Sequence, residues 1–309
     1  MRLVTRSDFD GLVCGVLLKI AGLVDDYKFV HPKDLQDGIV EVTQNDVLAN
    51  VPYVPGCGMW FDHHSSEYER LGDIRFEGLF KVLPSCARVV WEYYGGHARF
   101  PEKFDALMDA VDKIDSGRLE ISDITDPKGW VLLGLIMDPR TGLGRYRDYR
   151  ISNYTFMLDL INYCSSKSID EILAMDDVKE RTDRYFAQEK LFRAMITENS
   201  TLHNNVLVID LRNQEEIYSG NRFTAYALYP KANISIQVIW GFKRQNIVFT
   251  VGYSILNRTS TKDVGKLMLQ YGGGGHSRVG TCQIPIDKAD QTLKELIEAL
   301  QDDSLKETA

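Results

Sequence analysis

Acidic and histidine side chains gather in two short stretches near the start of the chain. The first stretch, RSDFDG, carries Asp8 and Asp10, one residue apart. The second, FDHHSSE, carries Asp62 followed by His63 and His64. Carboxylates and imidazoles together suit Mn²⁺, Fe²⁺ or Zn²⁺, and carboxylates with fewer imidazoles suit Mg²⁺. The two stretches therefore predict a metal site, provided that the fold brings them together.

These stretches fall where the strands of a parallel sheet are expected to end. Residues 2–6 predict a strand, and residues 11–23 predict a buried helix after a glycine turn. Residues 39–44 predict a further strand, which would end just before Asp46, and the run GMWFDHH predicts one that ends in the histidines. Strands that alternate with helices are typical of a doubly wound, mainly parallel sheet, in which ligands gather at the carboxyl ends of the strands. We therefore expect Asp46 and both stretches to meet at that edge.

Two metal ions at such an edge would suit phosphoryl chemistry. Ions about 4 Å apart hold a phosphoryl oxygen and deprotonate a bridging water at neutral pH. Two cations at that separation need a carboxylate between them, and Asp46 is the residue that we expect to bridge. Asp62 and His63 would complete the second ion's site, with Asp62 either binding the ion or orienting the imidazole.

Each stretch also has a structural interpretation. DFDG alone is typical of a turn or a helix cap, because aspartate accepts hydrogen bonds from backbone N–H groups there. A pair of adjacent histidines is a weak signal alone. Both stretches on strand ends of one alternating pattern, with Asp46 between them, favour the metal site.

The second half of the chain has a different pattern. Residues 168–198 form a charged, helix-favouring stretch that would connect two domains. The runs NVLVIDL, ISIQVIWGF and NIVFTVGYSI predict strands, followed by a helix at 262–271, the run GGGGH, a strand through TCQIPI and a closing amphipathic helix. We predict an α/β protein with a catalytic domain at 1–160, a helical linker at 161–202 and a smaller α/β domain with a mixed sheet at 203–309.

The glycine run of the second domain is a candidate anion site. Gly273, Gly274 and Gly275 expose backbone N–H groups with no side chains in the way, which suits close approach to a phosphate or carboxylate. His276 and Arg278 follow directly and could reach the same anion. The alternative is a flexible hinge, but a glycine linker seldom carries a histidine and an arginine immediately before a strand.

Composition limits the class of partner. The 309 residues include 36 basic and 44 acidic side chains, a net charge of −8, which disfavours binding to long duplex nucleic acid but leaves room for a local pocket for a small anion. No apolar run approaches the ~20 residues that span a bilayer, and no basic-then-apolar leader opens the chain. We expect a cytoplasmic protein with no membrane partner.

The motifs together resemble one family. DFDG, then ND sixteen residues before DHH, then PSCARVVWEYYG, resemble the DHH phosphoesterase superfamily. GGGGHSRVG is similar to the signature of its associated C-terminal domain, in the branch of nano-RNases, pAp phosphatases and RecJ-like nucleases, often described as exopolyphosphatase-related. The resemblance covers nearly the whole chain. It implies a two-domain phosphoesterase with two Mn²⁺ ions (Mg²⁺ or Co²⁺ as alternatives) in the first domain, a substrate-gripping second domain, a cleft between them, and a homodimer.

The resemblance also implies roles for individual residues. His64 would contact the substrate or the leaving group. The fourth motif lies in DAVDKIDSG, where Asp115 is favoured over Asp112 because it ends the apolar helix pattern; the sequence does not separate the two firmly. Arg258 would meet a substrate phosphate or base. The metal ligands would be Asp8, Asp10, Asp46, Asp62, His63 and one of Asp115 and Asp112.

One position departs from the family pattern. Many relatives carry a histidine or a further aspartate just upstream of the first motif, whereas Val4 and Arg6 stand there in this chain. A cation does not ligate a metal and repels one if it points inward. Either the first metal site is weak and fills only when a substrate phosphate arrives, or Arg6 itself binds a phosphate.

The function predicted from these observations is a divalent-metal-dependent phosphoesterase acting on small nucleotides. The substrates would be short single-stranded oligonucleotides, pAp, or cyclic or linear dinucleotides, hydrolysed by a metal-activated water. Asp62, His63 and His64 are the expected catalytic residues. The alternatives are a hydrolase of polyphosphate or pyrophosphate, and a nucleotide-binding regulator that has lost its catalysis.

Overall fold

The structure is a computed structural model that describes residues 1–72 and 74–301. The chain divides into two compact units, and the boundary between them falls inside the long helix α10 (Asp176–Glu198). The predicted linker at 161–202 is therefore shared between the two units. Residues 302–309 of the predicted second domain lie outside the described residues. The first unit comprises Met1–Arg118 and Asp126–Tyr185, and the second comprises Leu119–Thr125 and the chain from Phe186 onward.

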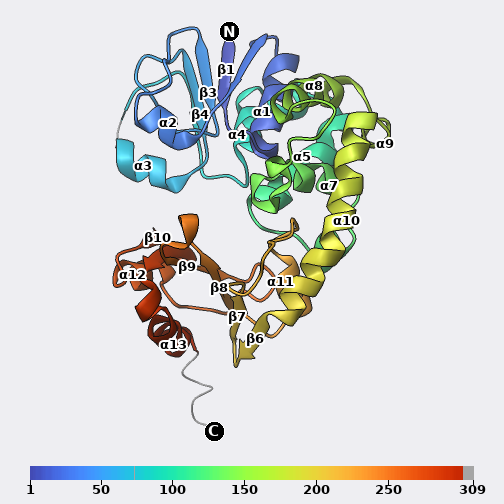
Figure 1. The fold of residues 1–309 in the computed structure, drawn as a ribbon. Coiled ribbons are helices and arrows are strands. Elements are labelled where there is room, and N and C mark those ends of the chain that lie inside the picture. Colours follow the sequence, from blue (N-terminus) through green and yellow to red (C-terminus); the bar gives the residue numbers. More distant parts are fainter. Residues whose placement is uncertain (73, 302–309) are drawn as a thin grey trace. The chain divides into compact units, whose positions relative to one another are not determined.

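A five-stranded sheet with the order β2-β1-β3-β4-β5 forms the centre of the first unit (Figure 1). All four neighbouring pairs are parallel, so the carboxyl ends of the strands lie along one edge. The predicted α/β class with a parallel sheet is thereby confirmed. The strands are β1 (Arg2–Thr5), β2 (Asp26–Phe29), β3 (Asp46–Ala49), β4 (Met59–Asp62) and β5 (Gly78–Phe80).

The third strand differs from the prediction. Residues 39–44 form no strand, and β3 begins at Asp46. A central strand of a parallel sheet is buried on both faces and has a continuous apolar sequence, as in Val47-Leu48-Ala49, rather than an alternating one. The alternating run at 39–44 instead leaves Ile39 exposed to solvent. The predicted strand was therefore placed too early in the chain.

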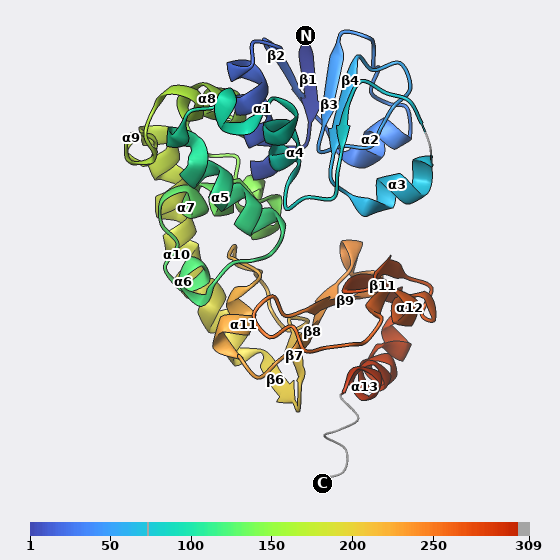
Figure 2. The same cartoon turned by 180° about the vertical axis from the view of Figure 1, so that it is seen from behind.

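Helices cover both faces of this sheet (Figure 2). Val4, Leu48 and Trp60 pack with Leu35 of α2 on one face, while Leu3 meets the helices of the other. None of the described helices combines the length and apolar character needed to cross a bilayer. The first face carries α2 (Pro32–Gln36) and α3 (Ser65–Leu71), and the second carries α1 (Phe9–Ile20), α4 (Cys86–Tyr93), α5 (Asp105–Asp115), α7 (Gly129–Met137) and α8 (Asn153–Ser166), with α9 (Ile169–Leu173) near α7 and α8.

Gly134 allows the helices behind the site to pack closely. A Cβ atom at this position of α7 would lie 2.3 Å from Cδ1 of Ile114 on α5 and 2.8 Å from Cδ1 of Phe9 on α1. Those two helices carry Asp115 and Asp10. The absence of a side chain at Gly134 thus supports the positions of two candidate ligands.

The second unit is built on a six-stranded mixed sheet with the order β10-β11-β9-β8-β7-β6. The β7–β8 pair is parallel and the other pairs are antiparallel. Helices α12 (Val264–Leu269) and α13 (Ala289–Leu300) bury one face, and α11 (Thr224–Leu228) and the end of α10 pack on the other near β7. This unit also holds α6 (Ile121–Thr125). Its strands are β6 (Ser200–His203), β7 (Val206–Asp210), β8 (Ile234–Trp240), β9 (Ile247–Tyr253), β10 (Gly274–His276) and β11 (Val279–Ile284).

Candidate metal centre

The turn from β1 to α1 holds the two aspartates of the first motif. Asp8 is the N-cap residue of α1, and its Oδ1 accepts a hydrogen bond from the backbone N–H of Gly11 at 3.0 Å. A Cβ atom at Gly11 would lie 2.2 Å from the carbonyl oxygen of Arg6, so the turn requires glycine. The capping interpretation of DFDG is therefore correct for Asp8, while Asp10 is buried one residue into the helix.

Asp10 is a buried carboxylate that faces other acidic groups. Its oxygens accept the backbone N–H groups of Cys86 at 2.9 Å and Ala87 at 2.8 Å, at the start of α4. Burial raises the pKa of Asp10 well above its ordinary value, and the charges of Asp115 and Asp8 raise it further against these hydrogen bonds. A cation placed nearby would stabilise the ionised form.

His63 directs an unpartnered nitrogen at two carboxylates. Its Nδ1 lies 3.0 Å from the carbonyl oxygen of Leu83, and because a carbonyl only accepts, Nδ1 carries the proton. In the neutral imidazole Nε2 then carries a lone pair. This nitrogen lies 3.2 Å from Oδ2 of Asp115 and 3.8 Å from Oδ2 of Asp10. Nε2 is nevertheless buried with no hydrogen-bond partner among the described residues. Three lone-pair donors converging in this way fit a metal ion.

The structure separates the two candidates for the fourth motif. Asp115 is the last residue of α5 and reaches His63, whereas Asp112 accepts hydrogen bonds from Oγ of Ser85 at 2.7 Å and Nε of Arg88 at 2.9 Å. Burial raises the pKa of Asp115; the charge of His63 opposes the shift and that of Asp8 adds to it. Asp112 therefore joins α5 to α4 and lies outside the ligand cluster.

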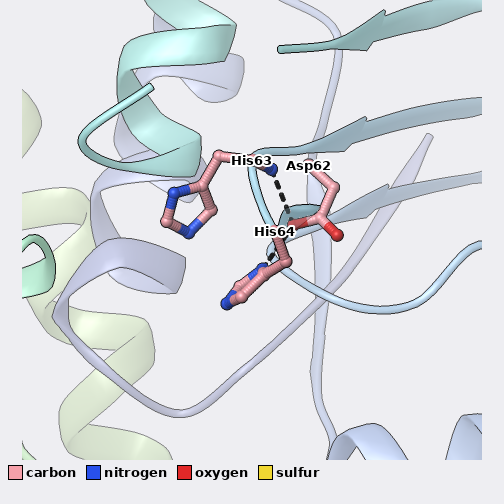
Figure 3. Close-up of side chains that lie close together, drawn as sticks. All are labelled: Asp62, His63 and His64. Atoms are coloured by element: carbon pink, nitrogen blue, oxygen red, sulfur yellow. Dashed lines mark hydrogen bonds and ion pairs between the residues drawn. The ribbon is translucent and has the colours of Figure 1, made fainter. Parts of the chain in front are cut away.

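Asp62 organises the paired histidines at the end of β4 (Figure 3). Its Oδ1 accepts the backbone N–H of His63 and Nδ1–H of His64, both at 2.8 Å. Its Oδ2 is buried without a partner among the described residues, and the three side chains form a second group of convergent ligand atoms. Burial lowers the pKa of His64, but the hydrogen bond to Asp62 and its charge outweigh burial and raise the pKa overall.

Asp46 lies at the amino end of β3, where the strands of the sheet begin, and not at the carboxyl ends where the candidate ligands gather. It is the first residue of β3, beside Arg2 at the start of β1, and accepts Nε and Nη2 of Arg2 at 2.6 and 3.0 Å. It also accepts the backbone N–H of Thr43 at 2.7 Å. The two ends of a four-residue strand are about 10 Å apart. The prediction that Asp46 bridges two metal ions is therefore wrong, because the strand boundary on which it depended was misplaced.

Asn50 takes the position at the carboxyl end of β3. Its Nδ2 donates to Oδ1 of Asp8 at 3.1 Å, and its Oδ1 is buried without a partner among the described residues. Its φ of +57° is in the left-handed region, which asparagine tolerates. Asn50 was not among the predicted site residues. The available signal was the end of the apolar run Val47-Leu48-Ala49.

Two arginines add positive charge next to the carboxylates. Nε of Arg6 lies 3.0 Å from Oδ2 of Asp8. Nε of Arg140, in the turn after α7, donates to Oδ1 of Asp138 at 2.7 Å. Burial lowers the pKa of Arg140, but this hydrogen bond and the charges of Asp138, Asp8 and Asp115 raise it overall. Arg140 was not predicted, because its only local signal is an ordinary Asp-Pro-Arg turn.

The glycine run of the second unit forms a strand hairpin. Gly274, Gly275 and His276 make up the edge strand β10, which pairs with β11. A Cβ atom would lie 2.1 Å from the carbonyl oxygen of Thr281 at Gly273, and 2.2 Å from that of Val279 at Gly275. The glycines thus permit close approach of the two strands.

The charged side chains predicted near the glycine run are open to solvent. His276, Arg278 and Arg258 are all exposed, and Nε of Arg258 donates to the carbonyl oxygen of Ile255 at 2.9 Å. Their contact with substrate stays a prediction.

The fold and the ligand cluster define a phosphoesterase of the DHH superfamily, as the motifs predicted. No protein-family model and no curated protein matches the chain. Among solved structures, PggH from Vibrio cholerae, described as a pGpG-specific phosphodiesterase, is 51% identical, covers 97% of this chain and 98% of its own, and has a TM-score of 0.88. The chain belongs to the family of this phosphodiesterase. CDC45 from Entamoeba histolytica shares the fold alone, with 8% identity, coverage of 97% and 95%, and a TM-score of 0.51.

Proposed function

We propose that this chain is a divalent-metal-dependent phosphodiesterase that hydrolyses a linear dinucleotide, and pGpG in particular. The observation that carries the metal-dependent chemistry is the lone pair of His63 Nε2, directed at Asp115 and Asp10 and without a hydrogen bond from any described residue. Support for the substrate comes from the 51% identity to PggH over nearly the whole of both chains.

The ion would be held by Asp10, His63 and Asp115. Asp62 and Asn50 add buried oxygens that have no hydrogen-bond partner in the described part of the chain. Mixed carboxylate and imidazole ligands suit Mn²⁺, and Mg²⁺ and Co²⁺ are the ions to compare with it. When bound, the ion would polarise the phosphoryl oxygens and lower the pKa of a water molecule. The carbonyl of Leu83 fixes the tautomer of His63, which keeps Nε2 available as a ligand.

The chain's other polar groups would hold the substrate. Asp62 holds His64 through Nδ1, so that the Nε2 edge of this partly exposed ring is left to contact a phosphate oxygen. Arg6 and Arg140 supply positive charge near Asp8 for the same purpose. We also propose that residues of the second unit contact a phosphate group of the substrate. These residues are Gly273, Gly274, Gly275, His276, Arg278 and Arg258.

A substrate panel tests this function. The full chain would be incubated with Mn²⁺ and pGpG, cyclic di-GMP, pAp, pyrophosphate or short polyphosphate, alongside His63→Ala. We expect turnover of pGpG above the other compounds and a loss of at least about 100-fold in His63→Ala, since the ion contributes several kcal/mol to catalysis. Equal turnover in the variant, or tight nucleotide binding without turnover under any divalent ion, would contradict the proposal.

A further inference from the structure

We propose that the site holds one divalent ion, at Asp10, His63 and Asp115, and that the guanidinium of Arg6 supplies the second positive charge, beside Asp8. A site with two ions would need a second cation at Asp8, and the groups around this carboxylate leave no place for one. The part of this inference that concerns substrate phosphate rests on the proposed function; the part that concerns the number of ions does not.

The oxygens of Asp8 are already engaged by donors. Oδ1 accepts the backbone N–H of Gly11 at 3.0 Å and Nδ2 of Asn50 at 3.1 Å, while Oδ2 pairs with Nε of Arg6 at 3.0 Å. Asp8 belongs to neither group of convergent ligand atoms found among the described residues. Its charge is therefore compensated by the protein itself. At His63, in contrast, no described residue donates a hydrogen bond to the Nε2 lone pair.

The residue between the two positions opposes a second ion. Asn50 directs its amide N–H group at Asp8, because the opposite orientation would bring its oxygen against a carboxylate oxygen. Asn50 donates an amide N–H to Oδ1 of Asp8, and the guanidinium of Arg6 lies against Oδ2 as an ion pair, so a metal ion at Asp8 would have to displace these groups. The only aspartate on β3, Asp46, lies at the amino end of the strand, away from the candidate ligands. No bridging carboxylate comes from this strand.

Arg6 is suited to bind phosphate as well as to balance Asp8. Nε of Arg6 pairs with Asp8, and the side chain is 37% exposed, so the guanidinium is also accessible to a ligand. A planar guanidinium binds phosphate through two parallel hydrogen bonds. It does not activate water, so that task falls to the single ion.

The number of ions is the first test. Mn²⁺ would be titrated into the full chain, in the absence of nucleotide, while electron paramagnetic resonance reports the free ion. We expect one ion per chain for the wild type and for Arg6→Lys, which keeps the charge, and a second ion for Arg6→Asp. Two ions of similar affinity in the wild type would overturn the inference, as would a count of one in folded Arg6→Asp. The wild-type count stands even if that variant fails to fold.

Binding of pGpG in EDTA is the second test, because no turnover interferes there. We expect Arg6→Gln to weaken binding by about 10-fold or more, as for a lost hydrogen bond to a charged group, and Arg6→Lys to weaken it less. Arg2→Gln is the matched control, since Arg2 also pairs with an aspartate but at the opposite end of β1. Unchanged binding in Arg6→Gln, or equal losses in the Arg6→Gln and Arg2→Gln variants, would overturn the phosphate role.

The two proposals fail in different ways. One ion per wild-type chain without hydrolysis of pGpG would leave the ion count intact and remove the proposed substrate. Hydrolysis of pGpG by a chain that binds two ions would keep the function and remove the role of Arg6 as the second cation.

Discussion

Nε2 of His63 lies 3.2 Å from Oδ2 of Asp115, and in the neutral imidazole that donates through Nδ1 to Leu83 this nitrogen carries a lone pair. Two lone pairs held at this distance in a largely buried site are costly unless a cation lies near both. The arrangement explains why an aspartate at the end of α5 and a histidine after β4 are brought together. It is the geometric core of the candidate metal centre.

The first prediction separates Asp115 from Asp112, three residues earlier on the same helix. Asp115→Asn should weaken Mn²⁺ binding by more than about 100-fold, because it removes a carboxylate ligand. Asp112→Asn should keep the affinity and lower the free energy of unfolding by about 1–3 kcal/mol, since it breaks charged hydrogen bonds to Ser85 and Arg88. Metal titration and urea unfolding of both variants check this. Equal losses of metal affinity would contradict it.

The second prediction concerns Asp46 and Arg2. Asp46→Asn should lower the free energy of unfolding by about 1–3 kcal/mol at neutral pH without changing the number of bound ions. Burial raises the pKa of Asp46, but the hydrogen bonds from Arg2 and Thr43 lower it overall. A depressed folded pKa stabilises the fold above the unfolded value near about 4.

The contribution of Asp46 is then lost as the pH falls through the depressed value of the folded state. The difference in unfolding free energy between wild type and Asp46→Asn should therefore shrink below about pH 4. Unfolding at neutral pH and at acid pH measures it. If Asp46→Asn bound fewer metal ions than the wild type, Asp46 would have to be a metal ligand, which would contradict this prediction.

The third prediction uses the helix contact at Gly134. Gly134→Ala should destabilise the fold by about 1–3 kcal/mol, because the added methyl group overlaps Ile114 and Phe9. The energetic cost of this overlap exceeds the gain of about 1 kcal/mol in helix propensity. Gly144→Ala is the control, since a Cβ atom there meets only Nδ2 of Asn153, at 3.8 Å. Thermal unfolding of both variants checks the contrast, and a Gly134→Ala variant as stable as wild type would refute it.

The fourth prediction concerns Arg140. Its charge acts on Asp8 and Asp115 while Asp138 holds its Nε. Arg140→Gln should raise the KM for pGpG about 10-fold and leave the Mn²⁺ count unchanged, because a charged phosphate contact is lost and no ligand is removed. Arg147→Gln, an exposed arginine further along the same segment, should leave KM unchanged. A fall in bound Mn²⁺ in Arg140→Gln would give this arginine a different role.

The sequence predicted those parts of the site that depend on local patterns. Apolar runs ending in Asp-Phe-Asp and Asp-His-His located the carboxyl ends of β1 and β4, and the end of an apolar helix pattern favoured Asp115 over Asp112. The boundaries of β3 could not be read in the same way. Its apolar part is only three residues long, and the alternating run before it resembles a half-buried strand. Asp46 was therefore predicted at the carboxyl end of a strand, although it lies at the amino end of β3.

Residues brought in by tertiary packing were beyond the sequence. Asn50 became a candidate only once the end of β3 was known, and Arg140 only once α7 was seen to pack against α5. The contact of Arg6 with Asp8 follows from the turn at Gly11, so the departure from the family motif was visible in the sequence but its consequence was not.

The most direct measurement is the rate of pGpG hydrolysis by the full chain with Mn²⁺, after removal of the ion with EDTA, and after its return, with Asp115→Asn and Asp112→Asn in parallel. We expect turnover that disappears with the ion, returns with it, is lost in Asp115→Asn and persists in folded Asp112→Asn. Hydrolysis of pGpG that continues in EDTA or in Asp115→Asn would contradict it.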